Sequence, residues 1–165
     1  MSEGGGTEVK FIADAMLGKL ARWMRTLGCD VEYSSSMDAA GLIEKAAKED
    51  RTILTRDTLL VKRRKARARS FFVEGDLVDA QLRQVVERFG LPRRPALTRC
   101  LRCNRLLERV EKGSVREKVP PYVFNTQEEF SACPSCKRLY WAGTHRQRME
   151  EDVARLIGND GSGGA

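Results

Sequence analysis

The sequence has no long hydrophobic run and only one histidine, and these two absences exclude several classes of protein. A membrane-spanning helix needs ~20 consecutive apolar residues, and no stretch approaches that length. Residues 1–6 are small and acidic, which is unlike a signal peptide. We therefore expect a cytoplasmic protein with no membrane partner. Because the single histidine, His145, lies far downstream, the chain offers no Ser/His/Asp arrangement for nucleophilic catalysis.

Basic residues outnumber acidic ones, with 30 Lys and Arg against 23 Asp and Glu and a formal net charge of +7. Hydrophobic residues make up 41% of the 165 positions, which is enough for a core, so wholesale disorder is not expected. A basic domain favours an anionic partner, of which nucleic acid is the commonest. A basic protein without such a partner can have the same composition, so charge alone does not decide between the two.

Short apolar runs alternate with helical patterns through the first half of the chain. In one of these patterns Leu17, Leu20, Met24 and Leu27 recur at helical spacing, and Gly28 then ends the helix. The alternation predicts an α/β domain with a central parallel sheet and helices on both of its faces. The predicted strands are at 9–13, 29–33, 52–55 and 70–73.

A second unit is expected beyond a short linker. The segment 91–99 has two prolines and three arginines, which is typical of a linker. After it come short β-like stretches and a last helix expected to begin near His145. We therefore predict one domain over residues 7–92 and a second over residues 98–157.

Four of the five cysteines form two C-x-x-C pairs, which are the most specific signal in the chain. Each pair places two thiolates on one face of a tight turn, and two pairs complete a tetrahedral site for structural Zn²⁺, with Zn–S near ~2.3 Å. A disulfide pair is the weaker alternative in a chain expected to be cytoplasmic. The fifth cysteine, Cys29, lies inside a predicted strand and is expected to be buried. The predicted zinc ligands are Cys100, Cys103, Cys133 and Cys136.

Acidic residues follow the predicted strands at their carboxyl ends. Asp14, Asp57 and Asp76 come shortly after three of the strands, and Asp38 follows another after a short loop. In an open parallel sheet these ends border one crevice, so we expect the four acids to converge there. Crowded carboxylates need cations, and oxygen ligands favour Mg²⁺ or Mn²⁺. Two such ions ~4 Å apart can promote hydrolysis of a phosphodiester.

Each acid also has a structural interpretation. Asp38 can be only the N-cap of a helix, and Asp76 can be only a turn residue. Glu44, on the helix after Asp38, either faces the crevice or is solvated. Asp14 and Asp57 are harder to explain in this way, because neither precedes an obvious long helix.

Basic residues surround these acids in the sequence. Lys19, Arg22 and Arg25 recur on one face of the first predicted helix, and Arg56 adjoins one of the acids. Residues 51–69 contain eight Lys or Arg and one acid. Such a run is usually a solvated surface, but beside a metal crevice we interpret it as a phosphate contact.

Aromatic and basic residues interleave after the second cysteine pair. Tyr140 and Trp141 stand among Arg138, Arg146 and Arg148. This composition suits stacking on bases and contact with phosphates of single-stranded RNA. Packing of the two rings against the ribbon explains them equally well, so both interpretations stay open at this point.

Several of these segments resemble one family. Residues 11–25, FIADAMLGKLARWMR, are similar to the opening of the PIN-like ribonuclease domain found at the C-terminus of the Mut-seven exonucleases and as stand-alone prokaryotic proteins. Residues 53–57, ILTRD, resemble the L-T-R-D signature of that family. Residues 99–104 and 140–145 resemble the motifs of its ribbon. The resemblance runs from about residue 9 to residue 149.

The resemblance implies a three-layer PIN-like α/β domain followed by a zinc ribbon, and cleavage of RNA with Mg²⁺ or Mn²⁺. By motif position, Asp14, Asp38 and Asp57 carry over as catalytic acids that bind the metal, and Asp76 as a further ligand. We therefore expect a metal-dependent ribonuclease, an endonuclease of RNA processing or decay. Its substrate would be single-stranded or structured RNA, with tRNA and rRNA among the candidates. The residues expected to contact RNA are Lys19, Arg22, Arg25 and Arg56.

Other functions use parts of the same pattern. A non-catalytic RNA- or ribosome-binding adaptor would keep the fold and the ribbon, but it has no need for acids at the strand ends. A phosphoacceptor signalling domain needs an acidic pair at the first strand, where Asp14 is followed by Ala15. A phosphatase with D-x-D at that strand fails at Met16. The adaptor is thus the main alternative to the ribonuclease.

Overall fold

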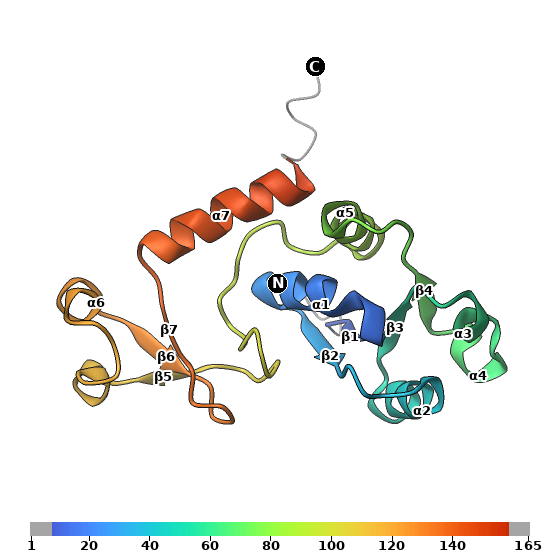
Figure 1. The fold of residues 1–165 in the computed structure, drawn as a ribbon, viewed down its shortest axis with the longest axis horizontal. Helices are drawn as coiled ribbons and strands as arrows, with labels where there is room; N and C mark the ends of the chain where they lie inside the picture. The colour runs from blue at the N-terminus through green and yellow to red at the C-terminus, as the bar shows by residue number, and fades with distance from the viewer. Residues whose placement is uncertain (1–7, 159–165) are drawn as a thin grey trace, which may run out of the picture.

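A computed structural model describes residues 8–158 of the chain. The first half forms an α/β lobe, and a smaller lobe with its own sheet follows (Figure 1). The last helix, α7 (Thr144–Ile157), runs from the small lobe back to the larger one (Figure 1). Within the described residues no helix combines the length and apolar character needed to cross a membrane.

The α/β lobe is built on a four-stranded sheet of order β2-β1-β3-β4, in which every neighbouring pair is parallel. Each strand lies within the range predicted for it, because short runs of β-branched and apolar residues flanked by turn residues mark buried parallel strands clearly. The strands are β1 (Lys10–Ala13), β2 (Asp30–Tyr33), β3 (Thr52–Thr55) and β4 (Ser70–Phe72).

Helices cover both faces of this sheet because the side chains of each strand alternate between two apolar clusters. Phe11 and Leu54 face a cluster with α1 and α5, whereas Ile12 and Ile53 face a cluster with α2, α3 and α4. The predicted α/β fold is thereby confirmed. The helices of this lobe are α1 (Gly18–Thr26), α2 (Ala39–Glu49), α3 (Thr58–Lys62), α4 (Arg64–Arg67) and α5 (Val78–Phe89).

The small lobe contains an antiparallel sheet of order β5-β6-β7. Its core is small and centres on Phe130, Val115 and Val119. A lobe with so little apolar surface depends on other constraints, such as a bound metal, for its stability. Its elements are β5 (Glu108–Val110), η2 (Lys112–Val115), α6 (Pro121–Thr126), β6 (Phe130–Ala132) and β7 (Leu139–Trp141).

Helix α7 packs on the α/β lobe. Val153 and Ile157 are buried in the same cluster as α1 and α5. Arg83 of α5 donates a hydrogen bond to the carbonyl of Leu156, at 2.9 Å. The unit predicted over residues 98–157 includes this helix, but in space its apolar side chains complete the core of the larger lobe. The chain therefore leaves the α/β lobe after α5, forms the ribbon and returns.

The first cysteine loop docks on the edge strand β2. Asn104 adopts a left-handed conformation (φ 68°), and its side-chain oxygen accepts a hydrogen bond from the backbone N–H of Val31, at 3.0 Å. Its amide nitrogen donates to Asp30, at 2.7 Å. From the other side, Arg25 of α1 donates to the carbonyls of Val31 and Leu101. These contacts cover an edge strand that would otherwise expose unpaired backbone groups.

Candidate active site and metal centre

Asp14, Asp38 and Asp57 follow the carboxyl ends of neighbouring strands and lie at helix N-termini. Asp14 caps the short helix η1 (Ala15–Leu17), Asp38 caps α2 and Asp57 caps α3. Each carboxylate accepts a hydrogen bond from a backbone N–H of its helix, at 2.8 to 2.9 Å. All three acids therefore have the capping role that the sequence suggested for Asp38. A cap occupies one carboxylate oxygen, which leaves the other for a different partner.

Asp14 is the most constrained of the three acids, and this residue is only 7% exposed. Its Oδ1 accepts from the N–H of Met16, at 2.9 Å. Its Oδ2 accepts from the hydroxyl of Thr55, at 2.5 Å, and from the N–H of Arg56, at 2.9 Å. These contacts use both lone pairs of Oδ2 and fix the carboxylate, so Oδ1 is the oxygen with a lone pair left for a metal ion.

Asp14 and Asp57 line the same small pocket, which has a volume of about 180 Å³. Thr55 connects them, since its hydroxyl donates to Asp14 and accepts from the backbone N–H of Asp57, at 2.9 Å. Asp38 is not a lining residue, although Met37 and Ala39 on either side of it are. The other lining residues are Ala15, Met16, Leu42 and Leu60. The pocket thus combines two carboxylates with mostly apolar walls.

These three acids also have no basic partner within the described part of the chain. In residues 8–158, no Lys or Arg nitrogen lies within 4.0 Å of the carboxylates of Asp14, Asp38 or Asp57. A metal cation could bind these carboxylates without displacing a basic side chain. The other described aspartates all have an arginine within that distance, and they are Asp30, Asp50, Asp76, Asp79 and Asp152.

The four cysteines predicted as zinc ligands come together in the small lobe. Their sulfur atoms all lie within 4.8 Å of one another, and no other described group of three or more potential ligands does so. The two loops have matching geometry. Each is followed by a residue with positive φ, Asn104 at 68° and Lys137 at 67°. The backbone N–H of each of these residues donates to the carbonyl of the first cysteine in its pair. Such a group can hold a metal ion such as zinc.

Comparison with known protein families gives one match. The model of the Mut7-C RNAse domain family matches residues 9–153, which is most of the chain. The chain belongs to this family. Neither a search of curated proteins nor a search of solved structures gave a significant match. Membership confirms the resemblance found in the sequence and implies a ribonuclease-type function, with RNA as the substrate.

Asp76 does not join the acidic pocket of this Mut7-C domain. Its side chain is 91% exposed and forms an ion pair with Arg56, at 2.9 Å. Arg56 also donates to the carbonyl of Val73, at 3.1 Å. Asp76 lies four residues beyond the end of the edge strand β4 and directly after Gly75, which has a positive φ of 88°. The expected convergence of four acids is therefore limited to two in one pocket and a third beside it.

The basic residues expected to contact substrate lie in different surroundings. Lys19 and Arg22 are exposed on α1, and Arg56 is half-buried against Asp76. Arg25 is buried, and burial lowers the pKa of its guanidinium, although nearby acidic groups oppose that shift. Arg25 is only 6% exposed and its guanidinium donates to the backbone carbonyls of Val31 and Leu101, so little of it is accessible to a phosphate.

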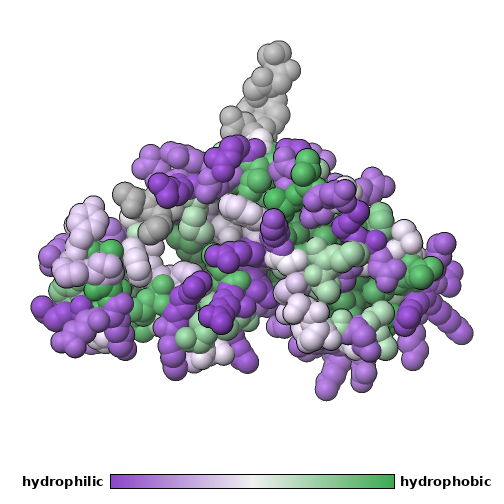
Figure 2. All heavy atoms as spheres, in the orientation of Figure 1, coloured by the Kyte–Doolittle hydropathy of each residue, from purple (hydrophilic) through white to green (hydrophobic). Residues whose placement is uncertain are grey.

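A second basic surface begins directly after the acidic pocket. Hydrophilic side chains project from the end of the molecule where α3 and α4 lie (Figure 2). In the described chain none of the basic residues exposed there has a carboxylate within 4.0 Å. We call this set the α3–α4 basic surface, and it consists of Lys62, Arg63, Arg64, Lys65 and Arg67.

The aromatic pair after the second cysteine loop is divided between two faces of the ribbon sheet. Trp141 packs on Phe130 in the core of the small lobe, with ring centroids 6.2 Å apart. Tyr140 donates to the sulfur of Cys100, at 3.2 Å, and accepts from the N–H of Leu101, at 3.1 Å. Burial raises the pKa of Tyr140 to about 12, so its hydroxyl keeps the proton that it donates.

The surroundings of Cys100 change the pKa of its thiol. Burial alone would raise its pKa, but hydrogen bonds from Tyr140 and from the backbone of Arg102 and Cys103 lower the pKa to about 6. The thiolate is the form of cysteine that binds metal ions. Cys29 is different, because burial raises the pKa of its thiol to about 12 and it lies outside the cysteine cluster. Its expected role as a buried apolar side chain is consistent with its 5% exposure.

Proposed function

We propose that this domain is a metal-dependent ribonuclease whose catalytic Mg²⁺ or Mn²⁺ is held by Asp14 and Asp57, with Asp38 as a third acid. The observation that carries the proposal is that these aspartates alone, among those described, have no arginine partner. Mg²⁺ is commonly bound by one or two carboxylates, while water and substrate phosphates complete its shell. A pocket with two fixed carboxylates suits that mode of binding.

Each residue around the acidic pocket would have a different role in this reaction. Asp14 would present Oδ1, and Asp57 the oxygen that does not cap α3. Thr55 would hold the Asp14 carboxylate in place through its hydroxyl. When bound, the ion would supply positive charge for the phosphodiester and acidify a water molecule. The apolar side chains of Met16 and Leu60 would limit solvent near the scissile phosphate, which strengthens electrostatic interactions there.

The RNA backbone would reach this pocket along basic side chains. Lys19 lies on α1, and the α3–α4 basic surface begins at Lys62, five residues after Asp57. Such contacts position phosphates without selecting a base sequence. The acidic pocket is open at the surface, so a strand could enter without threading a free end, which is why we propose an endonuclease. The zinc in the cysteine cluster would have a structural role, because four thiolates leave no open coordination position.

The experiment that tests this proposal uses circular and linear single-stranded RNA of one sequence. The zinc-loaded protein is incubated with each RNA in Mg²⁺, in Mn²⁺ and without either ion, and its zinc content is measured afterwards. We expect both RNAs to be cut only when Mg²⁺ or Mn²⁺ is present. Undiminished cleavage without these ions would overturn the metal mechanism. RNA binding with no cleavage under any condition would instead support the non-catalytic adaptor.

A further inference from the structure

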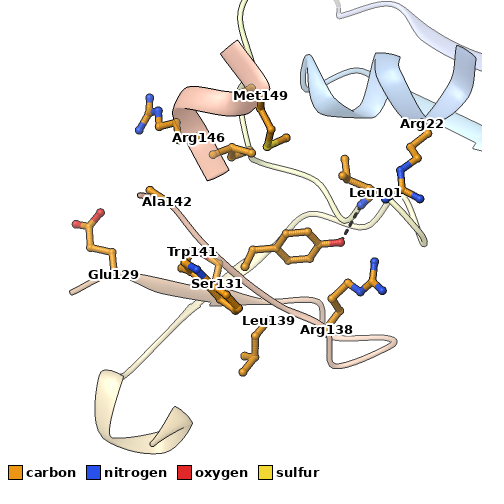
Figure 3. A pocket seen from close by; sticks show the side chains of 13 residues that line it. Arg22, Leu101, Glu129, Ser131, Arg138, Leu139, Trp141, Ala142, Arg146 and Met149 are labelled. Atoms are coloured by element: carbon orange, nitrogen blue, oxygen red, sulfur yellow. Dashed lines mark hydrogen bonds between the residues drawn. The ribbon is translucent and has the colours of Figure 1, made fainter. Parts of the chain in front are cut away.

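A larger pocket, with a volume of about 500 Å³, lies between the two lobes. It shares no lining residue with the acidic pocket. Its walls come from α1, the linker, the ribbon sheet and the beginning of α7 (Figure 3). Its size is within the ~300–1,000 Å³ that is typical of sites for small organic ligands. We call it the interlobe pocket.

One side of the interlobe pocket is apolar and partly aromatic. Tyr140 lies on the β7 face that also carries Ser131, its partner in the register of β6 and β7. Because the hydroxyl of Tyr140 is bonded to Leu101 and Cys100, the ring is held in one orientation. Met149 of α7 and Leu97 of the linker add apolar surface. A fixed aromatic ring with apolar neighbours is suited to stacking against a flat base.

The rim of the interlobe pocket is positively charged. Arg146 has a partner in Glu150, at 3.6 Å, and the one acid of the lining, Glu129, is paired outside it with Arg109. Arg22 and Arg138 have no carboxylate within 4.0 Å in the described part of the chain. Figure 3 shows both of them at the end of the pocket where Leu101 lies, with Arg146 at the other end.

We propose that the interlobe pocket binds one unpaired nucleotide of an RNA chain, with the base against Tyr140 and Met149 and the phosphate between Arg22 and Arg138. Planar guanidinium groups match phosphate oxygens, and an aromatic wall accepts any base. The identity of the ligand as RNA rests on the proposed function. Base-paired RNA would not fit, because a stacked base pair offers no single base to enter the pocket. The pocket would therefore direct single-stranded segments across the molecule.

The test measures binding of a fluorescent single-stranded octanucleotide RNA and of the same sequence as a duplex. All proteins are zinc-loaded, full-length and carry Asp57→Asn so that the RNA stays intact. The pocket variant combines Arg22→Ala with Arg138→Ala. The matched control combines Arg94→Ala with Arg105→Ala, two exposed arginines outside the pocket that lose the same charge. A third protein carries Met149→Trp, which fills the pocket and keeps the charge.

For the pocket variant we expect affinity for the single strand to fall about 10-fold, and the slope of log affinity against log salt to decrease by roughly 0.7, the value for one lost phosphate contact. The control should change affinity by no more than about 2-fold, and Met149→Trp should weaken single-strand binding without changing the salt slope. Affinity for the duplex should be similar in all proteins. Equal losses in the pocket variant and the control, or unchanged single-strand binding in the pocket variant, would overturn the proposal.

The failure of this proposal can be told apart from failure of the proposed function. Cleavage is measured separately in proteins that retain Asp57. Metal-dependent cleavage together with unchanged binding in the pocket variant would overturn the nucleotide site alone. A pocket variant with the expected binding loss, in a protein whose parent cuts no RNA, would support the nucleotide site and overturn the ribonuclease.

Discussion

The hydroxyl of Thr55 donates a hydrogen bond to the carboxylate of Asp14, at 2.5 Å. Thr55 is the last residue of β3 and Asp14 directly follows β1, which pairs with β3 in the sheet. The same hydroxyl accepts a hydrogen bond from the backbone N–H of Asp57, and Thr55 is fully buried. One buried group thereby fixes two acids that come from distant parts of the sequence. No pattern in the sequence indicates this role for Thr55, although it directly precedes the Arg-Asp pair.

Replacing Thr55 should disturb the acidic pocket at both acids. Thr55→Val keeps the shape of the side chain but removes a donor to Asp14 and the acceptor for the N–H of Asp57. We expect the free energy of unfolding to fall by about 1–3 kcal/mol and metal-dependent RNA cleavage to decrease. Thr55→Ser should retain most of both. Urea unfolding and cleavage rates check this, and equal behaviour of the two variants would show that the hydroxyl has no such role.

The contact between Asn104 and strand β2 joins the cysteine loop to the α/β lobe. Asn104→Ala would leave the N–H of Val31 without its acceptor and place a less suitable residue at positive φ. We expect a loss of about 1–3 kcal/mol in the free energy of unfolding and faster hydrogen exchange at the Val31 amide. Asn125→Ala, on the exposed face of α6, is the matched control. Unaltered exchange at Val31 would argue against this docking.

Arg25 is predicted to stabilise the fold and not to bind RNA. Lysine cannot reproduce the hydrogen bonds that the guanidinium makes to the carbonyls of Val31 and Leu101. Arg25→Lys should therefore lower the free energy of unfolding by about 1.5–3 kcal/mol while RNA affinity keeps its salt slope. Arg22→Lys, on the exposed face of α1, should leave stability nearly unchanged. Weaker RNA binding at full stability in Arg25→Lys would mean that Arg25 contacts the substrate.

The cysteine cluster should account for all bound zinc. Elemental analysis should find about one zinc per chain, and Cys133→Ser should remove it and destabilise the small lobe. Cys29→Ser is the control, since Cys29 lies outside the cluster and should leave the zinc content unchanged. In the native protein Cys29 should also resist thiol reagents, because burial raises its pKa to about 12. Equal zinc in the two variants would exclude the cluster as the site.

The strands and the cysteine site were predictable because their signals are local. Buried strands such as Thr52–Thr55 show as apolar runs, and a C-x-x-C pair carries its own turn geometry. The position of α7 was not predictable in this way. Its apolar stripe, which includes Val153, shows that the helix packs on something but not which lobe supplies the surface.

The roles of single residues could not be predicted from sequence spacing either, because they depend on tertiary contacts. Arg22 and Arg25 occur three residues apart on α1, and sequence spacing assigns them one role. The ribbon, however, docks over the C-terminal end of α1 and buries Arg25 while Arg22 remains exposed. Asp76 differs from Asp57 because several residues separate it from its strand, and that distance was enough to carry its side chain into solvent.

The substitution Asp57→Asn tests the central claim most directly. Asparagine can still accept the hydrogen bond from the N–H of Leu59 and cap α3, but it removes the negative charge proposed to hold the metal ion. The control is Asp50→Asn, an exposed aspartate already paired with Arg69. RNA cleavage in Mg²⁺ should fall by at least about 100-fold in Asp57→Asn and stay unchanged in the control, with the free energy of unfolding unaltered in both. Cleavage by Asp57→Asn at the wild-type rate would contradict the account.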